Sequence, residues 1–96
     1  MKRDDFIFAV GFQGNTAIVD KKAQRQYRKL TIDQLLERGL TGPALRAAIF
    51  DGDEAVVDLV REVYNRTGGT DYETGQLKRL FGVDSVPEGV ARVRAL

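Results

Sequence analysis

Residues 6–20, FIFAVGFQGNTAIVD, decide the fold, because two runs typical of β-strands flank a turn. The first run, residues 6–12, is dense in aromatic and β-branched residues. Alternate residues of a strand share one face, and on one face of this run they are Phe6, Phe8, Val10 and Phe12. The second run is residues 16–20, and Gly14 and Asn15 before it tolerate the positive φ angles of a tight turn. The sequence therefore predicts an N-terminal β-hairpin.

The clearest helical periodicity lies in residues 54–66. The apolar stripe of this segment consists of Val56, Leu59, Val60 and Val63. Asp51 or Asp53 is placed to cap the helix at its N-terminus, and Gly68 and Gly69 are placed to end it. A calcium loop starting at Asp51 is not indicated, because helical apolar residues occupy its ligand positions.

Other segments carry helix start and stop signals. Thr31 and Gln34 form a capping-box pattern, and Gly39 is a suitable stop for the helix that follows them. A second helix is predicted to begin at Pro43, since proline is favoured in a first turn. A further capping-box pattern, residues 70–73, predicts a helix that runs to Phe81.

Two segments stay open between alternatives. Residues 20–30 place Val19, Ala23, Tyr27 and Leu30 at helical spacing. This pattern favours a helix capped by Asp20, although a third strand is the other reading. Residues 90–95 can form either an edge strand or a tail.

The predicted fold class is α+β, in a single small globular domain of residues 1–96. An N-terminal β-hairpin, with or without a C-terminal strand, is packed by four or five short helices. The predicted core consists of Phe8, Val10, Val19, Leu35, Leu45, Ile49, Val56, Leu59, Val60, Val63, Leu77 and Leu80.

The composition argues against several classes of function. The chain contains no histidine and no cysteine, which removes the usual zinc ligands, Ser-His and Cys-His nucleophile pairs, and disulfides. We therefore expect no enzyme activity, no catalytic residue, no metal site and no cofactor. No apolar run approaches the roughly 18 residues of a membrane span, so we expect no membrane partner. A cytoplasmic location is the default for such a chain.

Positive charge is concentrated in residues 21–29, KKAQRQYRK, although the whole chain has a net charge of only +1. Without the five cations of this segment, ten cations face fourteen acidic residues, a net charge of −4. The segment is either the solvated face of a helix or a contact for nucleic-acid phosphates. The phosphate-contacting residues would be Lys21, Lys22, Arg25, Arg28 and Lys29.

Residues 31–52, TIDQLLERGLTGPALRAAIFDG, contain two predicted short helices around Gly39. This segment resembles the DNA-binding helix-turn-helix of phage-repressor type, with Leu40 after the turn and Leu45 and Ile49 as apolar residues of the second helix. The resemblance covers this part of the chain alone, and it implies that Arg46 would contact base edges. A plain αα-hairpin packed on a sheet is the competing interpretation.

The leading functional hypothesis is a small non-enzymatic module that binds a protein partner or itself. A hairpin sheet is too small to hide all its edges, and open edges are templates for strand pairing, including pairing into a homo-oligomer. The alternative is DNA or RNA binding through residues 31–52 and 21–29.

Overall fold

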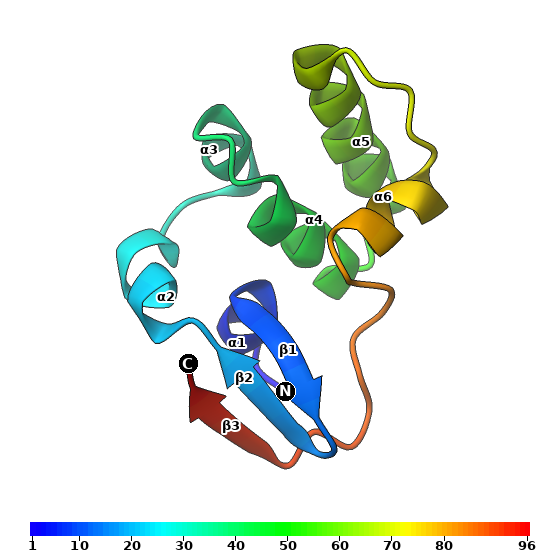
Figure 1. Cartoon of the computed structure of the whole chain (residues 1–96). Helices are drawn as coiled ribbons and strands as arrows, with labels where there is room; N and C mark the ends of the chain where they lie inside the picture. Colours follow the sequence, from blue (N-terminus) through cyan, green and yellow to red (C-terminus); the bar gives the residue numbers. More distant parts are fainter.

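The computed structural model describes residues 1–96 as six helices and a three-stranded sheet, which confirms the α+β class (Figure 1). In chain order the elements are α1 (Arg3–Ile7), β1 (Ala9–Gln13), β2 (Thr16–Val19), α2 (Lys21–Tyr27), α3 (Ile32–Glu37), α4 (Thr41–Phe50), α5 (Glu54–Gly68), α6 (Thr74–Leu80) and β3 (Arg92–Ala95). The sheet lies at one end of the molecule, with α1 between it and α4 (Figure 1). The segment 20–30 is mainly helical, as its apolar spacing favoured, because Lys21–Tyr27 form α2.

The predicted hairpin is present, and the C-terminal segment joins it as a third strand. β1 and β2 are antiparallel, and β3 runs parallel to β2 on its other side. Gly14 in the hairpin turn has a φ of +59°, the left-handed conformation expected there. The Asn15 carbonyl accepts hydrogen bonds from the amides of Ala91, at 2.8 Å, and Arg92, at 3.2 Å, and so fastens the start of β3 to the turn.

The prediction of a strand over residues 6–12 is wrong in its first half, because residues 3–7 form α1. Asp4 and Asp5 lie in the first turn of this helix, where carboxylates interact favourably with the exposed amides. A β-bulge between Ala9 and Gly11 then breaks the alternation that had placed Val10 with the phenylalanines.

The core consists of two clusters that share α1 and α4. Phe6 packs with the helices in the larger cluster, whereas Ile7 and Phe8 pack with β2 in the smaller one. On α4, Leu45 belongs to the first cluster and Ala47 to the second. The two helices thus join the sheet to the helical part of the molecule.

Most of the predicted core is confirmed. Phe8, Val19, Leu35, Leu45, Val60 and Leu77 are buried, and Ile49, Val56 and Val63 are half-buried. Three residues are exposed instead: Val10 by 55%, Leu59 by 39% and Leu80 by 51%. Val10 is turned outward at the bulge, Leu59 lies at the border of the α5 stripe, and Leu80 is the last residue of α6.

The predicted helix caps are confirmed at three starts. Asp20 accepts from the Ala23 amide, Thr31 forms the complete capping box, and Asp53 accepts from the Val56 amide. Two boundaries differ. α4 begins at Thr41, two residues before the predicted start, and the second capping box is formed by Glu73 with Gln76 rather than by residues 70–73.

Asn65 holds the connection between α5 and α6 in place. Its Nδ2 donates to the Tyr72 carbonyl at 2.9 Å, and its Oδ1 accepts from the Tyr72 amide and the Thr70 hydroxyl, each at 2.9 Å. This bonding orients α6, which carries the buried Leu77 into the larger core cluster.

Replacing Asn65 by alanine should destabilise the protein by about 2–3 kcal/mol, because three hydrogen bonds are lost at about 1 kcal/mol each. Urea unfolding followed by circular dichroism measures this change. Asn65→Asp keeps the acceptor but places a carboxylate oxygen against the Tyr72 carbonyl, so it should be destabilising as well. Equal stability of Asn65→Ala and the parent protein would contradict this role.

Candidate functional site

β1 is an edge strand with no partner on its outer side. The sheet order is β1-β2-β3, and no hydrogen bond from outside the β1–β2 ladder reaches residues 9–13. In an antiparallel pair, alternate residues direct their backbone groups away from the partner strand. The outer backbone groups of β1 therefore have no hydrogen-bond partner within the molecule. None of the five residues of β1, AVGFQ, is charged.

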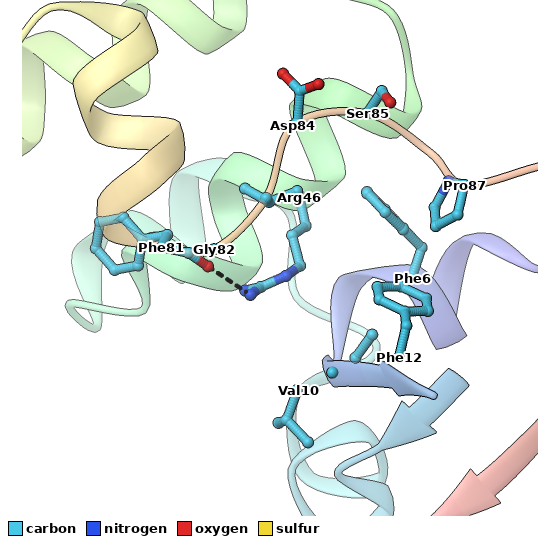
Figure 2. Close-up of a pocket in the computed structure, with 12 residues that line it drawn as sticks. Phe6, Val10, Phe12, Arg46, Phe81, Gly82, Asp84, Ser85 and Pro87 are labelled. Carbon is cyan, nitrogen blue, oxygen red and sulfur yellow. Dashed lines mark hydrogen bonds between the residues drawn. The ribbon is translucent and has the colours of Figure 1, made fainter. Parts of the chain in front are cut away.

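A pocket of about 290 Å³ lies along this free edge (Figure 2). One wall is β1, with Val10 and Phe12, and Phe6 of α1 lies beside it. The opposite wall is the segment after α6, residues 81–87, and Arg46 of α4 reaches in between them. The exposed Val10 and Phe12 thus belong to a hollow lined on several sides.

Arg46 occupies this pocket with an unpaired charge. Its Nη2 donates to the Phe81 carbonyl at 2.9 Å, and no carboxylate lies within 4.0 Å of the guanidinium. Asp84 also lines the pocket, but its carboxylate points away from Arg46 (Figure 2). Burial lowers the pKa of the Arg46 guanidinium below its usual value, and an arginine still stays protonated.

Gly42 provides the space for this arrangement. A Cβ at Gly42 would lie 3.0 Å from Arg46 Nη1 and 3.3 Å from the Phe81 ring, so a larger residue would push against both. Gly42 precedes Arg46 by one helical turn, and helical side chains lean toward the N-terminus over the preceding turn. The glycine therefore lets the guanidinium lie against α4 and reach Phe81.

The wall opposite β1 is anchored to the core. The Phe81 ring packs edge-on against Tyr64 of α5, with ring centroids 5.5 Å apart. Val83 is buried in the larger core cluster. The Arg46 hydrogen bond adds a third attachment, so the segment has fixed points on two helices and in the core.

A second, smaller depression of about 160 Å³ adjoins the pocket and shares Ala9, Val10 and Arg46 with it. It extends to Ala23 of α2 and Pro43 of α4. Arg46 therefore lines two neighbouring hollows, and both include Ala9 and Val10 at the start of β1.

The other edge strand of the sheet, β3, differs from β1 because it is charged. β3, RVRA, carries Arg92 and Arg94, and all four of its residues are exposed. Charged residues on an edge strand oppose the addition of a further strand. β1 has no such protection, which distinguishes it as the open edge.

The cations of residues 21–29 lie on and just after α2, and they divide into two groups. Lys21 approaches the Asp5 carboxylate at 3.3 Å. The other four are exposed and have no carboxylate within 4.0 Å: Lys22, Arg25, Arg28 and Lys29. Arg28 and Lys29 line a shallow depression with Leu59, whereas Arg46 lies in the β1 pocket. The structure thus does not group Arg46 with the basic segment.

The helix-turn-helix resemblance meets a geometric obstacle in α4. A recognition helix must present a face to the bases of the major groove. Every residue of α4 is buried or half-buried, because α4 packs against α1, α3 and α5. Nucleic-acid binding by this chain would therefore depend on the exposed cations on and just after α2 rather than on α4.

Sequence reasoning placed Arg46 in a DNA interface, predicted Val10 to be buried, and did not identify the pocket. Two signals were present: an uncharged strand, and a single arginine within the apolar segment GPALRAAIF of residues 42–50. Neither signal shows that the two segments meet, since Arg46 lies more than thirty residues after the strand.

Other site types find no support in the geometry. No three His, Cys, Asp or Glu side chains gather in a way that could hold a metal ion. No helix is both long and apolar enough to cross a membrane. Comparison of the chain with protein-family models, curated protein sequences and solved structures finds no significant match.

The contact between α1 and α2 makes stability depend on pH. Burial raises the pKa of Asp5, but hydrogen bonds from Gln24, at 2.9 Å, and Lys21, at 3.3 Å, outweigh it and leave the pKa below its usual value. A carboxylate with a lowered pKa in the folded state stabilises the protein above the unfolded pKa, about 4. This contribution is lost as the pH falls through the folded pKa.

Asp5→Asn should therefore destabilise the protein at pH 7 by about 1 kcal/mol, because the bonds lose their charged acceptor. Between pH 4 and pH 2 the variant should lose less stability than the parent protein, since it has no carboxylate to protonate there. Urea unfolding at pH 7, 4, 3 and 2 measures both effects. Parallel pH profiles would show that Asp5 contributes nothing to the acid sensitivity.

Proposed function

We propose that this protein is a non-enzymatic protein-interaction module that binds an extended polypeptide segment along β1. The observation that carries the proposal is an uncharged edge strand beside a pocket that is lined by both apolar and polar residues. In strand addition, backbone hydrogen bonds provide affinity, and pockets for alternate side chains provide specificity.

The expected affinity for an added strand suits a reversible interaction. A strand added to the five residues of β1 can form about four backbone hydrogen bonds, each worth about 1 kcal/mol. Burial of apolar side chains in the pocket adds about 1.5–3 kcal/mol for each residue that is fully covered. After the entropy cost of association, a dissociation constant of about 1–100 μM is expected.

Arg46 is the residue of the β1 pocket whose electrostatics support binding of a ligand. Of the groups whose pKa values depart from the usual, Arg46 alone lines the β1 pocket. The others form ion pairs elsewhere: Arg3 with Asp51, Lys21 with Asp5, and Arg61 with Asp58.

Lysine at Val10 and Phe12 should block the edge. The double variant Val10→Lys/Phe12→Lys places two charges that an added strand would have to bury, and peptide binding should weaken at least tenfold. The ligands are peptides selected from a random display library against the intact protein. Fluorescence anisotropy measures their affinity.

Val93→Lys is the matched control, because Val93 is 41% exposed and Phe12 is 42% exposed, and both flank Ala17 in the sheet. This control should bind as the parent protein does, and circular dichroism should show that all variants are folded. Equal weakening by Val93→Lys, or none in the double variant, would contradict binding at β1.

A second copy of the chain can also supply the added strand. In that case the protein would dimerise at micromolar concentration, and Val10→Lys/Phe12→Lys would be monomeric. Sedimentation velocity of the parent protein and the double variant distinguishes self-association from binding of a different protein.

The exposed cations on and just after α2 support nucleic-acid binding as a second candidate function. If Lys22, Arg25, Arg28 and Lys29 each contact a phosphate, the logarithm of the affinity for duplex DNA should fall with the logarithm of salt concentration with a slope of roughly −4. Arg25→Gln/Arg28→Gln should flatten this slope by about two. The interaction-module proposal predicts no gel shift even at low salt, and a salt-dependent shift would favour the second candidate.

A further inference from the structure

The charge of Arg46 is the least compensated feature of the β1 pocket. Taking a guanidinium partly out of water costs free energy, which a carboxylate partner or several hydrogen bonds normally offset. Arg46 donates one hydrogen bond, to the Phe81 carbonyl, and has no carboxylate within 4.0 Å. A ligand with a negative charge would complete this arrangement.

The guanidinium can reach such a ligand. Arginine has five N–H donors, of which Arg46 uses one. No fully buried side-chain nitrogen or oxygen in the molecule lacks a partner, so the nitrogens of Arg46 that make no hydrogen bond are not fully buried. They border the two hollows along β1.

We propose that the segment that adds to β1 carries an aspartate or glutamate side chain that pairs with Arg46, and that it belongs to a different protein. The inference rests on the proposed function and specifies its ligand. An extended segment on β1 would direct alternate side chains toward the hollows. An apolar side chain would contact Val10 and Phe12, and the carboxylate would reach Arg46 between the hollows.

A carboxylate fits this site better than a phosphate. Phosphorylated residues are bound by clusters of arginines. Arg46 is the one cation that lines either hollow, and Asp84 and Asp20 are nearby on the two sides. Both aspartates repel any anion, and a carboxylate with one negative charge meets less of this repulsion than a doubly charged phosphate, while it can still pair with Arg46.

The strands of this chain do not supply the carboxylate. β1 is AVGFQ, β2 is TAIV and β3 is RVRA, so none of them contains an acidic residue. Pairing of β1 with an edge strand of a second copy, β1 or β3, would bring no acidic strand residue to Arg46 and, with β3, would bring further arginines toward it. The charge therefore favours a partner protein over self-association.

The experiment uses the intact protein and a random twelve-residue peptide display library, followed by synthetic peptides. We expect selected sequences to share one acidic residue at a constant distance from an apolar residue. Changing that residue from Glu to Gln in a synthetic peptide should weaken binding to the parent protein about tenfold or more, the usual range for a hydrogen bond between charged groups.

Arg46→Gln tests the receptor side of the same contact. It should bind the Glu peptide about as weakly as the parent protein binds the Gln peptide, and it should discriminate little between the two. Arg25→Gln is the matched control, because Arg25 is an exposed arginine on α2. This variant should discriminate between the Glu and Gln peptides as the parent protein does. If Arg46→Gln fails to fold, the comparison of Glu and Gln peptides with the parent protein still decides the question.

The outcomes separate the two proposals. Selected peptides without a shared acidic residue, or equal affinity for the Glu and Gln peptides, would overturn the role of Arg46 while leaving strand addition intact. Glu-dependent binding that Val10→Lys/Phe12→Lys does not weaken would show a carboxylate site elsewhere than along β1. Failure to select any peptide would overturn both proposals.

Discussion

The packing of α1 between the sheet and α4 is the constraint on which the rest of the structure depends. Four consecutive residues, Phe6 to Ala9, are buried, although they pass from a helix into a strand. The change of conformation sends Phe6 into the helical cluster and Ile7 and Phe8 toward β2. A continuous strand would alternate its faces and could not bury all four against these two partners. Alanines on α4, including Ala44, Ala47 and Ala48, are small enough to let α1 approach closely.

The same packing creates the candidate site. The chain leaves α1 as β1 without another strand outside it, and α4 places Arg46 beside that edge, one residue before the buried Ala47. The segment after α6 is anchored by Phe81 and Val83 and forms the remaining wall. Three elements that are distant in sequence thus surround a single hollow. The pocket is a consequence of the core rather than of a local motif.

Arg46 connects this architecture to a functional proposal. A partly desolvated cation held by one backbone carbonyl is an incomplete arrangement, and it is located where an added strand would pass. By contrast, Arg3 forms two hydrogen bonds with Asp51, and Lys21 contacts Asp5, so these cations are satisfied within the molecule. The unpaired cations of residues 22–29 are exposed to water, whereas Arg46 is half-buried, and this combination of burial and a missing carboxylate distinguishes it.

The sequence by itself determined the local structure: the turn at Gly14, the caps at Asp20, Thr31 and Asp53, and the apolar stripe of α5. These features depend on residues a few positions apart, so propensity and hydrogen bonding within a short segment are sufficient to specify them. Only the tertiary structure decided that residues 3–7 are helical, that Val10 is exposed at a bulge, and that Arg46 lies beside β1. These outcomes depend on which buried surfaces meet across the molecule, and periodicity within one segment carries no information about its partner.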